Sequence, residues 1–494
     1  MTAPRRNSTI PLVAARERDA SVTSNRAVLA VCFVGYSALG IILAWSRLTG
    51  LGQSYWHDEI VTVVNFVRAG PREILFGNYM TNNHELFSLL SWATSSVVGE
   101  SEIALRLGSV IPFIVGVAVV TAWLHVRMGV LTALLFLFFS TLSPQLLDLS
   151  RQARGYGLAF LAMSALIVAA AEADRSRRSW AVATFCAAGV VGTWTLPIFG
   201  IAFFATGGVL LTNPSLRRRI LLGLAASTVA MVAWYAPHLG SLLKSSEQQF
   251  GDPIPWWGVV TAPIDQLLLP AVVGVDGTTL PTALGRIAII VASSLLLFSS
   301  PVLRETRTAL ILGSGAGVTL IVVWVTRLSL LPRFVSFLLV PLLIFLASGT
   351  ARVLAGSGTR RLRVRLAVAL AALVLVPVVF ASTAAQVTRL PREAHRDAAA
   401  LIKDQTSPNP PVFVHTLRPG DLAFYLKAPA RAPRASNLAS RVCSDQREVV
   451  LVVQPYRVRP IRVPCLNRVG VRHYRLRQYS RGDEINVWFI PPRS

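Results

Sequence analysis

Two adjacent carboxylates follow a long apolar run in the segment SYWHDEIVTVVNF, where Asp58 and Glu59 come directly after His57. Carboxylates at the edge of a membrane are functional candidates, because such a group could take a proton from an acceptor hydroxyl. The alternative is that both acids open a helix, where negative charge favours the helix dipole. Neighbouring residues on a helix point in different directions, so we expect one acid to face a reacting centre while the other holds a neighbour or a metal.

A second polar group lies further along, in the segment NYMTNNHELFSLL, which contains Asn82, Asn83, His84 and Glu85. Two amides, an imidazole and a carboxylate here precede an apolar run that we expect to form a helix. Helix capping by Asn82 or Asn83, with His84 and Glu85 in water, is the alternative explanation. The group shares a loop with Asp58, which favours a common site.

Arginines beside the apolar runs form the third group. The segment DLSRQARGYGLAF contains Asp148, Arg151, Arg154 and Tyr156, and Arg333 lies in RLSLLPRFVSF. The topology below places these arginines outside, against the usual bias of positive charge toward the cytoplasm. A bound phosphate would explain them, since guanidinium matches phosphate oxygens in a bidentate way. The alternatives are snorkelling at the interface and pairing with Asp148.

The three groups have complementary chemistry. A carboxylate could activate an acceptor hydroxyl, while arginines at the same face could hold a phosphate and stabilise it as it leaves. Because the site would border lipid, a lipid phosphate is a natural donor.

The composition predicts the elements that must position these residues. The chain has 494 residues, 53% of them hydrophobic, and several apolar runs reach the ~20 residues that cross a bilayer as a helix. The formal net charge is +24, and the arginines cluster between the apolar runs as topology signals do. These charges also attract anionic membrane lipids. We expect a polytopic α-helical membrane protein, and nucleic-acid binding is excluded because no recognised motif or basic soluble domain supports it.

The arginine distribution predicts eleven transmembrane helices with the N-terminus in the cytoplasm and the C-terminus outside. If the apolar stretch 85–99 crossed the membrane, the arginine clusters that follow it would move to the outside. We therefore expect this stretch to form an amphipathic helix on the outer surface. The expected spans are 27–46, 103–125, 128–145, 154–173, 179–194, 197–212, 219–237, 285–300, 308–326, 334–350 and 366–381.

Three regions follow from this topology. Residues 1–26 form a cytoplasmic tail, residues 27–381 form the transmembrane domain with outer loops 47–102 and 238–284, and residues 382–494 form a small extracytoplasmic α/β domain. The last region combines a helix near REAHRDAAALIKD with strands at PVFVHT, EVVLVVQP and INVWFI.

The four cysteines divide into two kinds. Cys32 and Cys186 lie in apolar runs and are expected to act as small hydrophobic residues. Cys443 and Cys465 lie in the C-terminal region and are candidates for a disulfide if that region is extracytoplasmic. No cysteine or histidine cluster has the spacing of a zinc site.

The motifs HDE after the first span, NNHELF in the same loop and SEIALRLGSV beyond it resemble those of the GT-C membrane glycosyltransferases. The similarity is greatest to the family 39-like branch with protein O-mannosyltransferases and lipid A aminoarabinose transferases. RQARGYGLA and LPRFVSFLLVPLL resemble later elements of that branch, and the resemblance covers roughly residues 27–350. One departure is clear: the branch commonly has His or Lys followed by two prolines, whereas His84 is followed by Glu85 and Leu86.

The resemblance implies a polyprenyl-phosphate-sugar donor, an acceptor at the outer membrane face and inversion at the anomeric carbon. Asp58 matches the first acid of the family's Asp-Glu pair and is the expected general base, with Glu59 orienting the acceptor or assisting. Some GT-C branches use a divalent cation and others do not; the sequence contains no metal-binding set and leaves this open. The expected phosphate-binding residues are His84, Arg151, Arg154 and Arg333, and the expected substrate-binding residues are Glu85, Asn83 and Tyr156.

The Ala-, Val- and Arg-rich composition is typical of a high-GC bacterium, which we interpret as actinobacterial. The sugar would then be arabinofuranose or mannose, and the acceptor a cell-wall glycan, a lipoglycan or a protein. The site would face the outside of the bacterial cytoplasmic membrane. Two other hypotheses stay open: a lipid or solute transporter or flippase, which needs charges near the bilayer midplane, and a non-enzymatic scaffold with a periplasmic domain.

Overall fold

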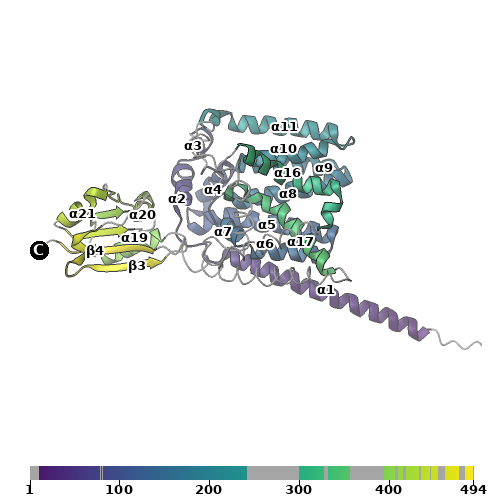
Figure 1. The fold of residues 1–494 in the computed structure, drawn as a ribbon, viewed down its shortest axis with the longest axis horizontal. Coiled ribbons are helices and arrows are strands. Elements are labelled where there is room, and N and C mark those ends of the chain that lie inside the picture. Colours follow the sequence, from purple (N-terminus) through teal and green to yellow (C-terminus); the bar gives the residue numbers. More distant parts are fainter. Residues whose placement is uncertain are drawn as a thin grey trace, which may run out of the picture.

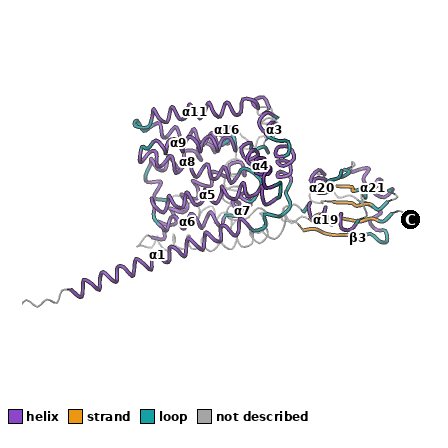
Figure 2. The backbone as a smooth tube through the Cα atoms, turned by 180° about the vertical axis from the view of Figure 1, so that it is seen from behind, coloured by secondary structure: helices purple, strands orange, loops and turns teal. Residues whose placement is uncertain are grey.

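The computed structural model has a helical bundle and a small C-terminal domain with a sheet, joined end to end (Figure 1). Figure 2, the view from behind, shows the same two parts. The structure describes residues 11–77, 79–80, 82–241, 300–326, 332–355, 394–406, 410–415, 419–432, 435–445, 447–453, 462–477 and 484–492.

The bundle is built around helix α8 (Tyr156–Ser176), which packs against α5 (Glu102–Met128) and α9 (Ser179–Thr195). Small buried residues such as Ala159 and Ala170 let the neighbouring helices approach α8 closely. The other long elements are α1 (Pro11–Leu48), α6 (Val130–Leu142), α10 (Phe199–Leu211), α11 (Arg217–Tyr235), α16 (Thr306–Thr326) and α17 (Leu339–Ala355).

Short elements cover the end of the bundle that faces the C-terminal domain (Figure 1). Helix α2 continues directly into the π-helical turn η1, a local widening that often occurs at functional sites. These elements carry most of the polar residues that the sequence singles out. They are α2 (His57–Thr62), η1 (Val63–Val67), α3 (Pro71–Phe76), α4 (Glu85–Val98), α7 (Pro144–Ser150), η2 (Ala236–His238) and η5 (Pro332–Leu338), while η4 (Pro301–Arg304) precedes α16.

Six helices among the described residues are long and apolar enough to cross a membrane, which supports a polytopic membrane protein. They correspond to six of the expected spans: Ala30–Leu48, Glu102–Met128, Tyr156–Ser176, Arg217–Ser241, Thr306–Val323 and Arg333–Ala355.

Other expected spans differ from what the structure has. The span expected at 128–145 is a 13-residue helix, because Pro144 begins the separate helix α7, and the span expected at 197–212 also has 13 residues. The stretch 85–99 forms α4, which buries Phe87 and exposes Val97. The expected spans 285–300 and 366–381 lie almost wholly outside the described residues, and the number of spans and their topology stay predictions.

The C-terminal domain contains a four-stranded sheet in the order β1-β2-β4-β3. Strands β1 and β2 are parallel, and the other two pairs are antiparallel. One face of the sheet packs against α19 and α20, and the other packs against α21. The elements are α19 (His395–Gln405), β1 (Val412–His415), α20 (Pro419–Leu426), α21 (Ala435–Ser444), β2 (Val449–Val453), η7 (Pro464–Asn467), β3 (Arg472–Arg477) and β4 (Glu484–Ile490).

Alternation along the strands assigns each side chain to one of these faces. Val412 and Val414 join the cluster beneath α19 and α20, whereas Phe413 joins the cluster beneath α21. Cys443, at the end of α21, forms a disulfide with Cys465 in η7.

A close approach of two helices fixes where the site residues before α8 lie. A Cβ atom on Gly157 would lie 1.9 Å from the backbone oxygen of Ser109 in α5, and the Gly157 N–H donates to the Ser109 hydroxyl at 3.1 Å. At the present distance between α5 and α8, only glycine therefore fits at position 157, in the first turn of α8.

We predict that Gly157→Ala separates α5 from α8 and destabilises the protein by about 1–3 kcal/mol, as overpacked cores do. The measurement is the apparent Tm of the purified protein in detergent. Gly208→Ala is the matched control, because a Cβ there meets no atom within 4 Å. Equal Tm values for the two variants would contradict the close-packing argument.

Candidate functional site

Asp58 lies in the first turn of α2 and is 5% exposed. One of its carboxylate oxygens, Oδ2, pairs with two guanidinium groups. It accepts a hydrogen bond from Nη1 of Arg154 at 2.8 Å and forms an ion pair with Nη2 of Arg333, also at 2.8 Å. The sequence placed these three residues in separate segments, and the structure brings them into direct contact.

The two arginines reach Asp58 from different parts of the bundle. Arg154 lies in the turn between α7 and α8 and is fully buried, whereas the Arg333 side chain is 22% exposed in η5, before α17. The Arg333 guanidinium also lies 5.3 Å from the centre of the Trp56 ring, a cation–π contact. The Nε–H groups of Arg154 and Arg333 have no hydrogen-bond partner among the described residues. Two guanidinium groups on one carboxylate leave a surplus positive charge.

Arg154 also organises the polar residues before α4. Its Nη2 donates to Oδ1 of Asn82 at 3.1 Å and to Nε2 of His84 at 3.0 Å. Nε2 of His84 is therefore the acceptor, which requires a neutral ring with its proton on Nδ1. Burial lowers the pKa of His84 well below its ordinary value, and the nearby charges of Arg154 and Arg333 lower it further. The lowered pKa and the hydrogen bond from Arg154 both favour the neutral form of His84.

Glu59 has a different environment from Asp58. It is fully buried, and its two oxygens accept from Nε and Nη2 of Arg106 at 2.9 and 2.6 Å. The backbone N–H groups of Trp56 and Ala153 donate to the same carboxylate at 3.1 and 2.6 Å. With its oxygens occupied by protein donors, Glu59 joins α2 to α5 and to the turn before α8. This geometry favours a structural role for Glu59 over the expected catalytic one.

Glu85 belongs to a neighbouring cluster rather than to the Asp58 ion pairs. It accepts a short hydrogen bond from the indole of Trp234, and its Oε1 lies 3.4 Å from Nε2 of His238. The Trp234 ring stacks on Trp194 with centroids 4.1 Å apart. Burial raises the pKa of Glu85 to about 8, and the hydrogen bond from Trp234 opposes part of that rise.

The remaining expected residues divide between the site and its surroundings. The Tyr156 ring lies against both Arg154, at 5.1 Å, and His84, at 5.0 Å, so it belongs to the site. Asn83 binds the protein instead: its amide donates to the Ile74 carbonyl at 3.2 Å and accepts from Ser88 at 2.9 Å. Arg151 is buried directly beyond the end of α7.

Sequence reasoning missed three residues that the structure brings into these clusters: Arg106, Trp234 and His238. It named Asn82 in the polar group but expected Asn83 to bind substrate, whereas Asn82 is the residue that contacts Arg154. Arg106 lies inside SEIALRLGSV, where an arginine in an apolar run was a signal for a buried ion pair. The choice between Asn82 and Asn83 had no signal in the sequence, because both are asparagines before the same helix.

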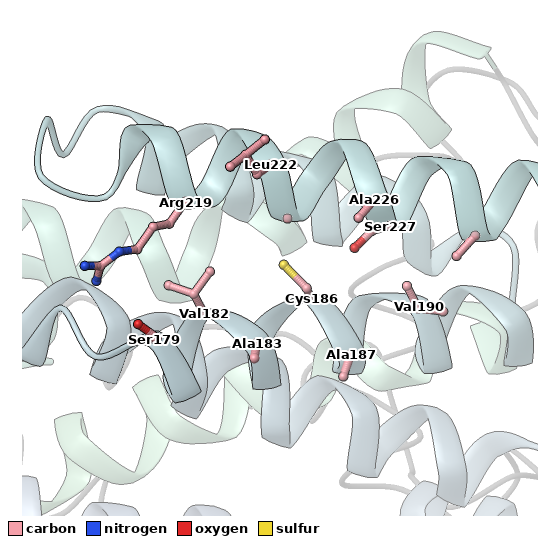
Figure 3. A pocket seen from close by; sticks show the side chains of 12 residues that line it. Ser179, Val182, Ala183, Cys186, Ala187, Val190, Arg219, Leu222, Ala226 and Ser227 are labelled. Carbon is pink, nitrogen blue, oxygen red and sulfur yellow. The ribbon is translucent and has the colours of Figure 1, made fainter.

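An open groove lies elsewhere in the bundle (Figure 3). It has a volume of about 550 Å³ between α9 and α11, is mainly apolar and carries Arg219 near one end. None of the candidate site residues lines it. Among the described residues, no three His, Cys, Asp or Glu side chains lie together as a metal site.

The fold is similar to that of known membrane enzymes. The chain resembles the apo crystal structure of ArnT from Cupriavidus metallidurans, with a TM-score of 0.52, 14% identity, and coverage of 94% of this chain and 98% of that chain. For ArnT bound to undecaprenyl phosphate, the TM-score is 0.50, the identity 15% and the coverage 92% and 98%. Archaeal oligosaccharyltransferase AglB from Archaeoglobus fulgidus gives a TM-score of 0.49 with 12% identity, over 84% of this chain and 69% of that chain. No protein-family model and no curated protein sequence matches the chain.

The chain shares the fold of ArnT. The similarity to ArnT extends over nearly the whole of both chains, so it includes the C-terminal domain as well as the bundle. This agrees with the fold that the resemblance implied. The particular GT-C branch, the bacterial source and the chemistry stay proposals.

The raised pKa of Glu85 predicts a pH-dependent stability. Between about 4.5 and about 8 the unfolded chain has lost a proton that the folded chain keeps, so the free energy of unfolding falls as pH rises. Glu85→Gln keeps a neutral side chain and should remove this dependence. We expect the apparent Tm of the unmodified protein to fall relative to that of the variant between about pH 5 and about pH 8.

Glu100→Gln is the control, because Glu100 pairs with Arg68 at the surface. A Tm difference between Glu85→Gln and the unmodified protein that stays constant over this pH range would contradict the prediction.

Proposed function

We propose that this chain is an inverting glycosyltransferase that moves a sugar from a polyprenyl-phosphate donor to an acceptor hydroxyl at the membrane surface. The observation that carries the proposal is the buried carboxylate of Asp58 on two arginines, which leaves a surplus positive charge beside a potential base. Buried charge needs compensation, and a phosphate would supply it. Guanidinium groups match phosphate oxygens well, and two Nε–H donors stay available for them.

In this mechanism the donor phosphate takes the place of Asp58 as the partner of Arg154 and Arg333. Asp58 is then released from both guanidinium groups and can accept the proton of the acceptor hydroxyl. The hydroxyl oxygen forms a bond to the anomeric carbon as the bond from that carbon to the phosphate oxygen breaks. Polyprenyl phosphate leaves with its negative charge stabilised by the arginines, and a single displacement inverts the anomeric centre.

Several neighbouring groups fit supporting roles. Neutral His84 and Asn82 accept hydrogen bonds from Arg154 without cancelling its charge, so they orient the guanidinium for the phosphate. Tyr156 supports the same two side chains from beside them. Glu85, with Trp234 close to it, is the proposed contact for sugar hydroxyls, since a carboxyl group beside an aromatic ring can bind both faces of a sugar.

The fold supports this assignment, because the structurally similar ArnT has been crystallised with undecaprenyl phosphate. At 15% identity the similarity concerns the fold, and the donor class comes to this chain as a proposal. We further propose arabinofuranose or mannose as the sugar, and a cell-envelope glycan, lipoglycan or protein as the acceptor. The proposed location is the cytoplasmic membrane of an actinobacterium with the site facing outside, and a divalent cation stays open.

A transporter or flippase is the alternative in another class. It would need charged residues near the middle of the membrane. Asp58 instead lies in the first turn of α2, Arg154 lies just before α8, and Arg333 lies in η5 before α17, so all three are at the ends of helical segments. No observation on the described residues favours a scaffold over an enzyme.

We expect purified protein to release polyprenyl phosphate from at least one member of a panel of polyprenyl-phosphate sugars, and Asp58→Asn to lower the rate about 100-fold or more. Asn keeps the shape of Asp but cannot accept the proton. The matched control is Asp174→Asn, which breaks the ion pair of Asp174 with Arg307 outside the site. Transfer by Asp58→Asn at the rate of the unmodified protein would overturn the assignment of the base.

We expect Arg333→Gln to weaken binding of polyprenyl phosphate by about 10-fold or more, since a charge-assisted hydrogen bond contributes about 1.5–3 kcal/mol. The measurement is a titration of detergent-solubilised protein with polyprenyl phosphate. Arg307→Gln is the control, because it removes an equally charged side chain that pairs with Asp174. Equal weakening in both variants would show that net charge matters rather than contact with the phosphate.

A further inference from the structure

The C-terminal domain contacts the chain immediately before Asp58. The backbone N–H of Tyr55 donates to the hydroxyl of Tyr425 in α20 at 2.5 Å. The Arg396 guanidinium in α19 donates to the Gly52 carbonyl at 2.5 Å and lies 3.3 Å from Glu102. Two helices of the C-terminal domain therefore bind backbone groups of residues 52–55. These hydrogen bonds do not depend on which side chains residues 52–55 carry.

His57 makes the contact nearest to Asp58. Its Nδ1 lies 2.8 Å from Oδ1 of Asp421 in α20, and Nε2 of His395 in α19 lies 3.7 Å from the other oxygen of the same carboxylate. Asp421 is only 3% exposed, so its carboxylate depends on the hydrogen bond with His57 to offset the loss of water. His57 and Asp58 are consecutive at the start of α2, so a shift of one moves the other.

Apolar contacts complete this interface. Phe424 and Tyr425 pack against the cluster that contains Tyr55, Ile60 and Phe87 at the end of the bundle. The Phe424 ring also lies edge-on to Tyr55, with centroids 6.3 Å apart. The contact therefore combines a buried carboxylate, backbone hydrogen bonds and aromatic packing, which together resist sliding of one domain on the other.

We propose that Asp421 is a positioning residue for the reaction. Through His57 it holds the start of α2, so that the Asp58 carboxylate lies at the correct position relative to the donor and the acceptor. This inference rests on the proposed function. It gives the C-terminal domain an indirect part in the reaction, because Asp421 acts only through the position of α2. Small displacements of a reacting group lower rates strongly. Loss of this contact should therefore lower kcat much more than it lowers the affinity for the donor.

The experiment compares Asp421→Ala, His57→Ala, the double variant and Asp421→Asn, with Glu448→Ala as the control. Glu448 is an acid of the same domain that pairs with Arg472 away from this interface. We expect Asp421→Ala and His57→Ala each to lower kcat about tenfold or more, with the KM for the donor unchanged within about twofold. The double variant should lose no more than either single variant, because both act through one contact. Asp421→Asn should recover much of the rate, since its amide oxygen still accepts from the imidazole.

Hydrogen exchange of the same proteins gives a readout that needs no activity. We expect Asp421→Ala to accelerate exchange across residues 55–62, and Glu448→Ala to leave it unchanged. Unchanged exchange there, or additive losses of kcat in the double variant, would overturn the positioning role while leaving the proposed function standing. If no donor in the panel is turned over, the proposed function fails. In that case faster exchange in Asp421→Ala would support the contact alone, and unchanged exchange would reject it.

Discussion

The shared carboxylate of Asp58, held by Arg154 and Arg333, is the interaction on which this end of the protein depends. Charges taken out of water are tolerated only when they find partners with good geometry. Three elements must therefore meet within hydrogen-bond distance: the start of α2, the turn before α8 and η5 before α17. Because two guanidinium groups share one carboxylate, the site has a surplus positive charge that favours binding of an anion.

Rigid surroundings keep these charges in place. Glu59 and Arg106 form a second, charge-balanced pair that joins α2 to α5, and the same carboxylate binds the backbone just before Arg154. The absence of a side chain at Gly157 lets α8 approach α5 closely. A balanced pair thus holds α2 in place, and the catalytic role that we propose belongs to the unbalanced group beside it. The two adjacent acids perform different tasks because neighbours on a helix face different partners.

The C-terminal domain stabilises the same region from outside the bundle. It contacts residues 52–57 and also Glu102 at the start of α5, so these contacts meet close to the beginning of α2. Buried ion pairs are weak evidence for stability, but they specify orientation when both partners must be satisfied. This explains why a small domain with its own sheet and disulfide would be coupled to a membrane site.

The sequence by itself determined the features that depend on local pattern. Apolar runs predicted the six long apolar helices, short apolar segments predicted three of the four C-terminal strands, and polar residues beside apolar runs marked Asp58, His84, Arg154 and Arg333. Tertiary structure decided which polar residue meets which: it selected Asn82 over Asn83, gave Glu59 to Arg106 and joined His57 to Asp421, 364 positions away. Local propensity carries no information about partners so far apart, because only the packing of whole helices brings them together.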